Sequence, residues 1–234
     1  VQTCALPISA QYFIGEMYYF GKEVTQDNKV AFKWFEKSAN QGDATAQYFI
    51  GLMYYLGRGV TQDYKEAFKW YEKSANQGNA KALLYLAEMY RLGIETNQDF
   101  NKAFKLYVGS ANQGNADAQK YLGFLYEDGS GVTQDYKKAF EWYNKSAEQE
   151  NADAQYSLGR IYAIGQGVTQ DYKKAFEWYK KSAEQGNIDA QFTLGMMYHR
   201  GDGTAQNDEI AEIWLKKAAG NGHKDAISLF EDDQ

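Results

Sequence analysis

The chain has 234 residues and a formal net charge of −6 at neutral pH, with basic and acidic residues interspersed. This balance argues against a nucleic-acid-binding protein, which gathers Lys and Arg on one surface. No apolar run approaches the roughly 18 residues that a membrane-spanning helix needs, so we expect no insertion into a membrane.

The first nine residues differ in composition from everything that follows. They contain the only cysteine, Cys4, and the only proline, Pro7. Residues 1–9 resemble the in-frame translation of a sequencing adapter, so we expect an appended, disordered segment. On this interpretation the natural N-terminus is missing together with any signal peptide. The compartment therefore stays open, either cytoplasmic or, with a lost signal peptide, periplasmic or secreted.

From Ala10 onward the sequence repeats with a constant period of 36 residues. The stretch GVTQDYKKAFEWY stands at 131–143 and again at 167–179. Repeats of this length form stacked structural units, each of which needs a neighbour to close its core. We therefore expect residues 10–234 to be a single solenoid domain. Its six repeats begin at residues 10, 46, 82, 118, 154 and 190, with a partial seventh from 226.

The first half of each repeat has the spacing of an amphipathic helix. In the second repeat, Ala46, Ile50 and Met53 recur at i, i+4 and i+7, on one face of a helix. Asn79 and its equivalents are expected to cap the first helices, and Gly57 and its equivalents to end them. A glycine also lies inside most first helices, as at Gly51. We expect an aromatic ring to approach closely there.

The second half of each repeat predicts a second, antiparallel helix. Asp63 is expected to cap it, and Glu66 three residues later predicts a capping box. All five tryptophans share one repeat position, which predicts that they pack the core. Glu150 replaces a helix-ending glycine, so we expect a strained left-handed residue there. The third repeat departs most from the pattern, for example with Glu95 in place of a loop glycine.

Together these motifs resemble the Sel-1-like repeats, which are relatives of the tetratricopeptide repeats. The resemblance rests on Leu122-Gly123, the turn from Gly129, the Asp135 start and the Trp142-Tyr143 pair. It implies an all-α fold, an α/α solenoid with a right-handed superhelix. It also implies a scaffold or adaptor that binds proteins. Some family members carry a cysteine pair in each repeat, which this chain lacks.

Repeat positions that vary from unit to unit are candidates for partner recognition. Three positions on one face of each first helix vary, and in such arrays the first helices line the concave side. We expect a peptide or partner protein to bind there, and we expect Leu52, Phe124 and Met196 to be exposed. The expected apolar anchors are Tyr48, Leu52, Tyr55, Phe124, Phe192 and Met196. We expect Arg91, Lys120 and Arg160 to recognise anions. The set is Tyr12, Glu16, Tyr19, Tyr48, Leu52, Tyr55, Leu84, Glu88, Arg91, Lys120, Phe124, Glu127, Tyr156, Arg160, Ala163, Phe192, Met196 and His199.

Two alternatives to a concave-face site stay open. Aromatic residues at the Tyr12 position are frequent enough to be core instead, and variation at the next position is also compatible with surface drift. Both alternatives are compatible with the sequence.

Catalytic and cofactor signals are weak. The two histidines, His199 and His223, lie in different repeats and form no metal-binding motif. We expect no cofactor, no metal and no catalytic residue. The alternative is a hydrolase of the β-lactamase-like type named for some relatives, although no Ser-Lys or Ser-His-Asp motif supports it. We also expect the open ends of the solenoid to self-associate.

Overall fold

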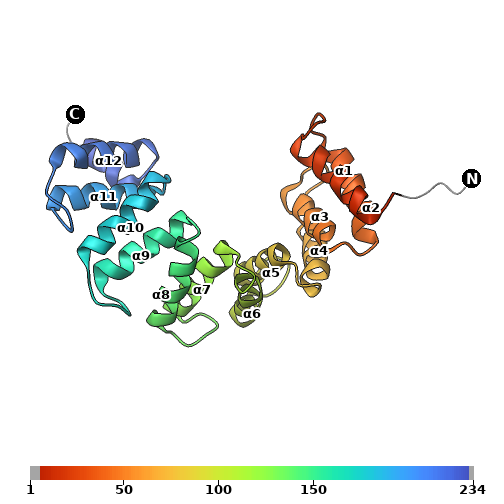
Figure 1. The fold of residues 1–234 in the computed structure, drawn as a ribbon, viewed down its shortest axis with the longest axis horizontal. Helices are drawn as coiled ribbons and strands as arrows, with labels where there is room; N and C mark the ends of the chain where they lie inside the picture. Colours follow the sequence, from red (N-terminus) through yellow and green to blue (C-terminus); the bar gives the residue numbers. More distant parts are fainter. Residues whose placement is uncertain (1–5, 232–234) are drawn as a thin grey trace, which may run out of the picture. The chain divides into compact units, whose positions relative to one another are not determined.

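The computed structural model describes residues 6–231, and within this range the chain forms thirteen α-helices and no β-strand (Figure 1). The all-α class is thereby confirmed. By its internal contacts the chain divides into two compact units, Val1–Asn115 and Ala116–Gln234, called unit 1 and unit 2 below. Unit 1 holds α1 (Ile8–Phe20), α2 (Asn28–Asn40), α3 (Ala44–Leu56), α4 (Tyr64–Asn76), α5 (Ala80–Leu92) and α6 (Phe100–Ala111). Unit 2 holds α7 (Ala116–Asp128), α8 (Tyr136–Ala147), α9 (Ala152–Ile164), α10 (Tyr172–Glu184), α11 (Ile188–Arg200), α12 (Asp208–Gly220) and α13 (Lys224–Glu231).

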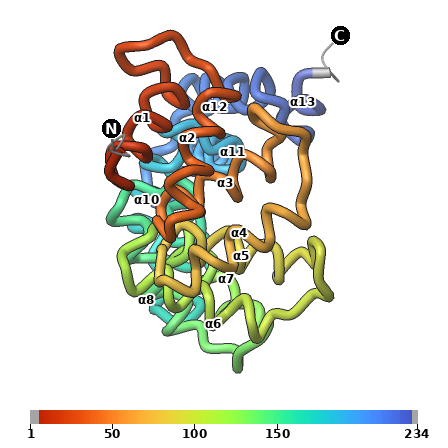
Figure 2. The backbone as a smooth tube through the Cα atoms, turned by 90° about the vertical axis from the view of Figure 1, so that its right-hand side faces the viewer, coloured from red at the N-terminus to blue at the C-terminus, as the bar shows by residue number. Residues whose placement is uncertain are grey.

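Inside each unit the helices pack in sequential pairs. In unit 1, α1 packs on α2, α3 on α4 and α5 on α6, and each second helix also packs on the next first helix. Unit 2 repeats this order from α7 to α12, and α13 packs on α12. The alternation of first and second helices can be followed along the tube in Figure 2. No helix in the described range is long and apolar enough to cross a lipid bilayer.

The helix ends confirm the capping residues expected from the sequence. Asn79 Oδ1 accepts a hydrogen bond from the Ala82 N–H over 3.0 Å, and Gly57 is left-handed with φ 67°. Asp63 Oδ1 accepts from the Glu66 N–H, as expected, but the Glu66 carboxylate pairs with another side chain of its own helix. The capping box is therefore only half formed.

Helix α1 begins at Ile8, inside the segment expected to be disordered. The Ser38 hydroxyl donates a hydrogen bond to the Ile8 carbonyl oxygen over 3.1 Å, and one repeat later Ser74 makes the same bond to the Ala44 carbonyl. The first helix therefore uses Ile8 as a regular repeat position. Of the expected appended segment, residues 1–5 lie outside the described residues.

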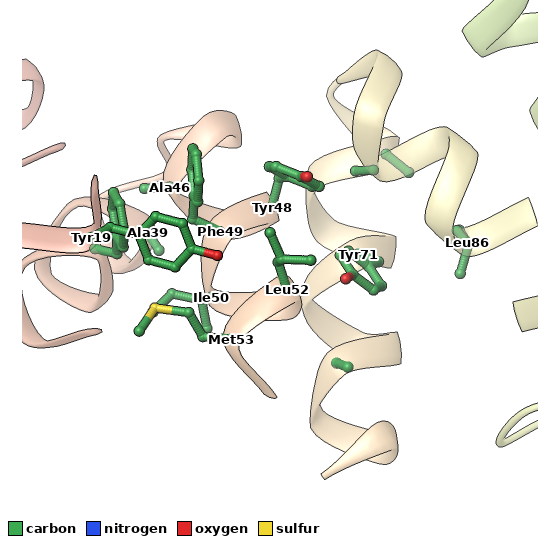
Figure 3. Packing of buried hydrophobic residues seen from close by; sticks show 14 of the residues in the cluster. Tyr19, Ala39, Ala46, Tyr48, Phe49, Ile50, Leu52, Met53, Tyr71 and Leu86 are labelled. Carbon is green, nitrogen blue, oxygen red and sulfur yellow. The ribbon is translucent and has the colours of Figure 1, made fainter. Parts of the chain in front are cut away.

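Close approach between the helices of a pair depends on the glycine inside the first helix. A Cβ atom added to Gly51 would lie 2.7 Å from Cδ1 of Tyr71, and the other helical glycines of this position meet a ring or leucine side chain as closely. The expected contact with a ring is confirmed. The tyrosine that follows the tryptophan is the more deeply buried ring, since Tyr71 is fully buried whereas Trp70 is half-buried. Tyr71 lies in the core cluster drawn in Figure 3. Lys73 Nζ lies 4.0 Å from the Trp70 ring centroid and covers it.

Consecutive repeats are joined by buried glutamines. In the second repeat, the Gln47 amide donates to the Ala39 carbonyl of the preceding repeat over 3.1 Å and accepts from Gln77 over 2.8 Å. Both polar ends of a side chain that is 6% exposed are thereby satisfied. In the third repeat Leu83 takes this position and forms neither bond, and Gln113 donates to backbone carbonyls instead. The irregularity expected for the third repeat therefore includes this junction.

Replacing Glu150 with glycine is expected to stabilise the fold by about 1 kcal/mol. Glu150 has φ 63°, and glycines at equivalent positions, such as Gly42 and Gly186, have open space around the missing Cβ. The gain would therefore come from relief of backbone strain alone. Thermal unfolding followed by circular dichroism measures it. Glu148→Gly is the matched control: Glu148 has φ −64°, so this change is expected to lower the melting temperature. A rise in both variants would contradict the strain argument.

Tyr71→Phe is expected to raise the free energy of unfolding by about 1 kcal/mol, because it removes a buried hydroxyl that has no hydrogen-bond partner. Phe35 occupies the equivalent position in the first repeat, so the ring without its hydroxyl fits the fold. Tyr143→Phe is expected to do the opposite, at a cost of about 1.5–3 kcal/mol, because the Tyr143 hydroxyl donates to Glu127 over 2.9 Å. Urea denaturation of the two variants should give shifts of opposite sign, and equal shifts would refute the assignment.

Candidate functional site

The surface expected to bind a partner comprises three positions of each first helix, and its burial differs between the units. In unit 1, the buried members are Tyr19, Tyr48, Leu52 and Leu84, and the half-buried members are Tyr12, Glu16, Tyr55, Glu88 and Arg91. In unit 2, the exposed members are Phe124 and His199, and the half-buried members are Lys120, Glu127, Tyr156, Arg160, Ala163, Phe192 and Met196. More of this face is accessible in unit 2 than in unit 1.

Leu52 corrects one expectation. It was expected to be an exposed anchor, but it is 9% exposed and belongs to the same core cluster as Tyr48, Tyr71 and Leu86 (Figure 3). Leu52 and Tyr48 are therefore core residues, as the alternative interpretation of the tyrosine position allowed. Phe124, which is 43% exposed, does reach the surface as expected.

The three basic residues expected to recognise anions are each engaged by a carboxylate of the same chain. The pairs are Arg91 with Glu88 at 2.7 Å, Lys120 with Asp153 at 3.1 Å, and Arg160 with Glu127. An anionic partner would have to compete with these carboxylates. Glu88 and Glu127 were expected on this face, but the pairing with basic residues was not, because two of the three pairs join residues 33 positions apart.

A hollow of about 430 Å³ opens on unit 2 between the first helices α7 and α9, and we call it the unit 2 hollow. Its lining comes from α7, from the loop and first turns of α8, and from α9 with the loop that follows. These residues are Phe124, Glu127, Asp128, Gln134, Tyr136, Tyr143, Ser157, Arg160 and Gln166. Three of them, Phe124, Glu127 and Arg160, were expected at the site.

A polar network fixes one wall of the unit 2 hollow. The Tyr143 hydroxyl donates to Oε2 of Glu127 over 2.9 Å, and the Arg160 guanidinium donates to Oε1 of the same carboxylate. Burial and the Glu127 charge raise the pKa of Tyr143, so its hydroxyl stays protonated as a donor. Burial alone would lower the pKa of Arg160, but its bond to Glu127 outweighs burial and raises it. The wall is thus a preorganised, charge-balanced pair beside an aromatic ring.

The hollow exists because one repeat position changes from aromatic to small. In unit 1, Phe49 stacks on Phe35 with ring centroids 4.7 Å apart and planes at 7°, and Tyr85 stacks on Tyr71 at 5.3 Å and 17°. Both rings fill the space between consecutive first helices. In unit 2 the equivalent residue is Ser157, whose short side chain lines the hollow together with Tyr143, which is still only 3% exposed.

A second, smaller hollow repeats this arrangement one repeat later. Thr193 stands at the same position, and the hollow beside it has a volume of about 180 Å³ with Tyr179 and Met196 in its lining. Sequence reasoning missed this position. The signal was an aromatic column that ends in two small polar residues: Phe13, Phe49, Tyr85, Tyr121, Ser157 and Thr193.

An exposed apolar row in unit 1 was also missed. Phe20, Leu56 and Leu92 each end a first helix, and they are 50%, 44% and 50% exposed. Each directly precedes the left-handed glycine that ends its helix. Phe20 also contacts the core ring of Phe49, with centroids 6.2 Å apart. An apolar residue before that glycine was the signal available in the sequence.

The histidines form local contacts. His199 Nδ1 lies 2.7 Å from Asp208 Oδ1, and the His223 ring stacks on Phe192 with centroids 4.2 Å apart. Among residues 6–231, no three His, Cys, Asp or Glu side chains are grouped so that they could hold a metal ion.

The comparison with known protein families identifies the repeat. The Sel1 repeat model matches six consecutive segments: 8–43, 44–79, 80–115, 116–151, 152–187 and 188–223. Each segment begins two residues before the alanine used to mark the repeats in the sequence. A search of curated protein sequences gave no significant match.

Two solved structures are similar to the chain in both fold and sequence. The Sel1 repeat protein from Oxalobacter formigenes is 33% identical with a TM-score of 0.86, over 94% of this chain and 91% of that protein. A protective antigen of uropathogenic Escherichia coli strains, which displays an SLR fold, is 37% identical with a TM-score of 0.86 over 94% of this chain. This chain spans 47% of the antigen's length. The α/α solenoid is confirmed, and the chain belongs to the Sel1 repeat family.

Proposed function

We propose that the chain is a non-catalytic interaction module that binds a peptide or partner protein on its first-helix face, with the unit 2 hollow as its principal site. Sel1 repeat proteins are generally protein-interaction scaffolds. The observation that carries the proposal is the hollow of about 430 Å³, with exposed Phe124 at its edge and a fixed polar pair in its wall. Concave sites with a few oriented polar groups are typical of ligand recognition, and here six of the nine lining residues are polar or charged.

The proposal is tested by affinity capture from a lysate of the source organism. Phe124→Glu combined with Met196→Glu places charges in the unit 2 hollow and in the neighbouring hollow at Thr193. This double variant is expected to lose a protein that the parent retains, because charged side chains oppose apolar contact. The matched control is Ile213→Glu, on second helix α12, where the side chain is 64% exposed. Equal loss in the control, or equal capture by the double variant, would argue against a first-helix site.

A β-lactam turnover assay tests the alternative of a hydrolase. We expect no hydrolysis above the uncatalysed rate, since the residues of the unit 2 hollow include one serine, Ser157, and neither Lys nor His. A serine without a neighbouring base is a weak nucleophile. Measured turnover that Ser157→Ala abolishes would overturn the non-catalytic assignment.

A further inference from the structure

The aromatic column of unit 1 provides an internal template for an occupant of the unit 2 hollow. Phe49 is 6% exposed and contacts rings on three sides, including Tyr12 at 6.0 Å and Tyr19 at 5.4 Å between centroids. Tyr85 in the next repeat contacts Tyr48 at 5.8 Å and stacks on Tyr71. The space between consecutive first helices therefore has the dimensions and the lining of an aromatic-ring site.

The unit 2 hollow retains the receiving half of this arrangement. Tyr143 is the counterpart of Tyr71, is 3% exposed and lines the hollow. Its hydroxyl is satisfied by Glu127, so the ring is held in place. No ring is inserted beside it, because Ser157 stands where Tyr85 stands in unit 1, and an incoming ring would meet only the small accessible part of Tyr143. Phe124 and Tyr136 add aromatic surface to the same lining.

The charges of the hollow favour a ligand that carries Lys or Arg next to the aromatic ring. Glu127 and Arg160 neutralise one another, whereas Asp128, also in the lining, has no basic partner among the described residues. One uncompensated carboxylate at an aromatic-lined site attracts a cation and disfavours an acidic segment.

We propose that the unit 2 hollow binds a peptide segment carrying an aromatic side chain next to Lys or Arg, with the aromatic ring in the place that Phe49 and Tyr85 fill in unit 1. This inference rests on the proposed function and adds the chemistry of the ligand. Aromatic pairs prefer the offset-stacked or tilted geometries that the chain itself uses at these positions. The hollow at Thr193 is smaller, so the segment is anchored first in the unit 2 hollow, beside Ser157.

Selection from a library of short random peptides tests the inference, with the folded parent chain and Ser157→Tyr as parallel targets. Ser157→Tyr supplies the missing ring from within, as Tyr85 does in unit 1, and is expected to fold and to occupy the hollow. Peptides enriched on the parent are expected to contain an aromatic residue beside Lys or Arg. Their affinity, measured by fluorescence anisotropy, should fall at least about tenfold on Ser157→Tyr and stay unchanged on Glu177→Tyr, which adds a ring at an exposed position of second helix α10 outside the hollow.

The possible results separate this inference from the proposed function. Peptides that bind the parent and Ser157→Tyr equally would leave an interaction module but remove the hollow as its site. Peptides that Ser157→Tyr excludes but that lack aromatic residues would keep the site and refute the ligand chemistry. No enrichment on the parent would overturn this inference, whereas the proposed function fails only if affinity capture also retains no partner that the double variant loses. If urea denaturation shows that Ser157→Tyr is less stable than the parent, Ser157→Met fills the hollow with a flexible side chain and replaces it in the same comparison.

Discussion

Phe35→Ala is expected to lower the free energy of unfolding by about 3–5 kcal/mol, which would be the largest effect of any single truncation proposed here. Phe35 is fully buried and stacks on Phe49 of the following repeat. It also covers Gly15, whose missing Cβ would lie 2.7 Å from the Phe35 ring. Truncation thus removes contacts within a repeat and between repeats. In a solenoid the loss of an interface term weakens both neighbours.

Urea denaturation followed by far-ultraviolet circular dichroism measures the effect of Phe35→Ala. Phe13→Ala is the matched control, because Phe13 is also a phenylalanine of the first repeat but is 57% exposed. Truncation of Phe13 is expected to change stability by less than about 1 kcal/mol. Similar losses for the two variants would show that stability in unit 1 does not follow burial.

Gly159→Leu is expected to destabilise the fold by about 3 kcal/mol through overpacking. A Cβ atom at Gly159 would already lie 2.7 Å from Cδ1 of Tyr179, a ring that is 5% exposed. Gly159→Ala is expected to be close to neutral, since the single methyl group gains about 1 kcal/mol of helix propensity while crowding the ring. Ala87 stands at this position in the third repeat, so one methyl group is compatible with the fold.

Differential scanning calorimetry of the Gly159 variants gives the required stability series. Gly220→Leu is the control, because Gly220 is also helical but has no atom within 4 Å of its missing Cβ. It is expected to leave the melting temperature unchanged or slightly higher. A Gly159→Leu protein as stable as the parent would mean that Tyr179 can leave its place against α9.

The local structure of a repeat could be predicted because it depends on residues close in sequence. Asp63 and Asn79 cap their helices and Gly57 ends one, since each bond is made within a few residues. The strained Glu150 was predictable for the same reason, as its φ follows from the turn that its repeat equivalents form with glycine. The close approach of Gly51 to a ring was predictable because a glycine inside a helix is costly unless packing requires it.

The candidate site was predicted only in part, because its accessibility depends on side chains from the neighbouring repeat. Leu52 and Phe124 share a repeat position and were expected to behave alike. In the structure Leu52 is buried among aromatic residues, whereas Phe124 borders the unit 2 hollow. The difference is consistent with Tyr85 following in one case and Ser157 in the other. Variation at a position therefore did not indicate exposure.

The sequence by itself determined the period, the helix pairs, their ends and the family, because the residues that pack and cap the helices recur at the same positions of the repeats. Only the tertiary structure decided which faces are filled and which charges are free. From the sequence, Arg160 was expected to be available to an anionic partner. In the structure it is paired with Glu127, which lies 33 residues earlier. In the sequence, Ser157 is not distinguished from other polar residues. Its importance is visible only when its surroundings are compared with those of Phe49 and Tyr85 at the same repeat position. Both facts arise where one repeat stacks on the next, and that contact brings together residues about one period apart.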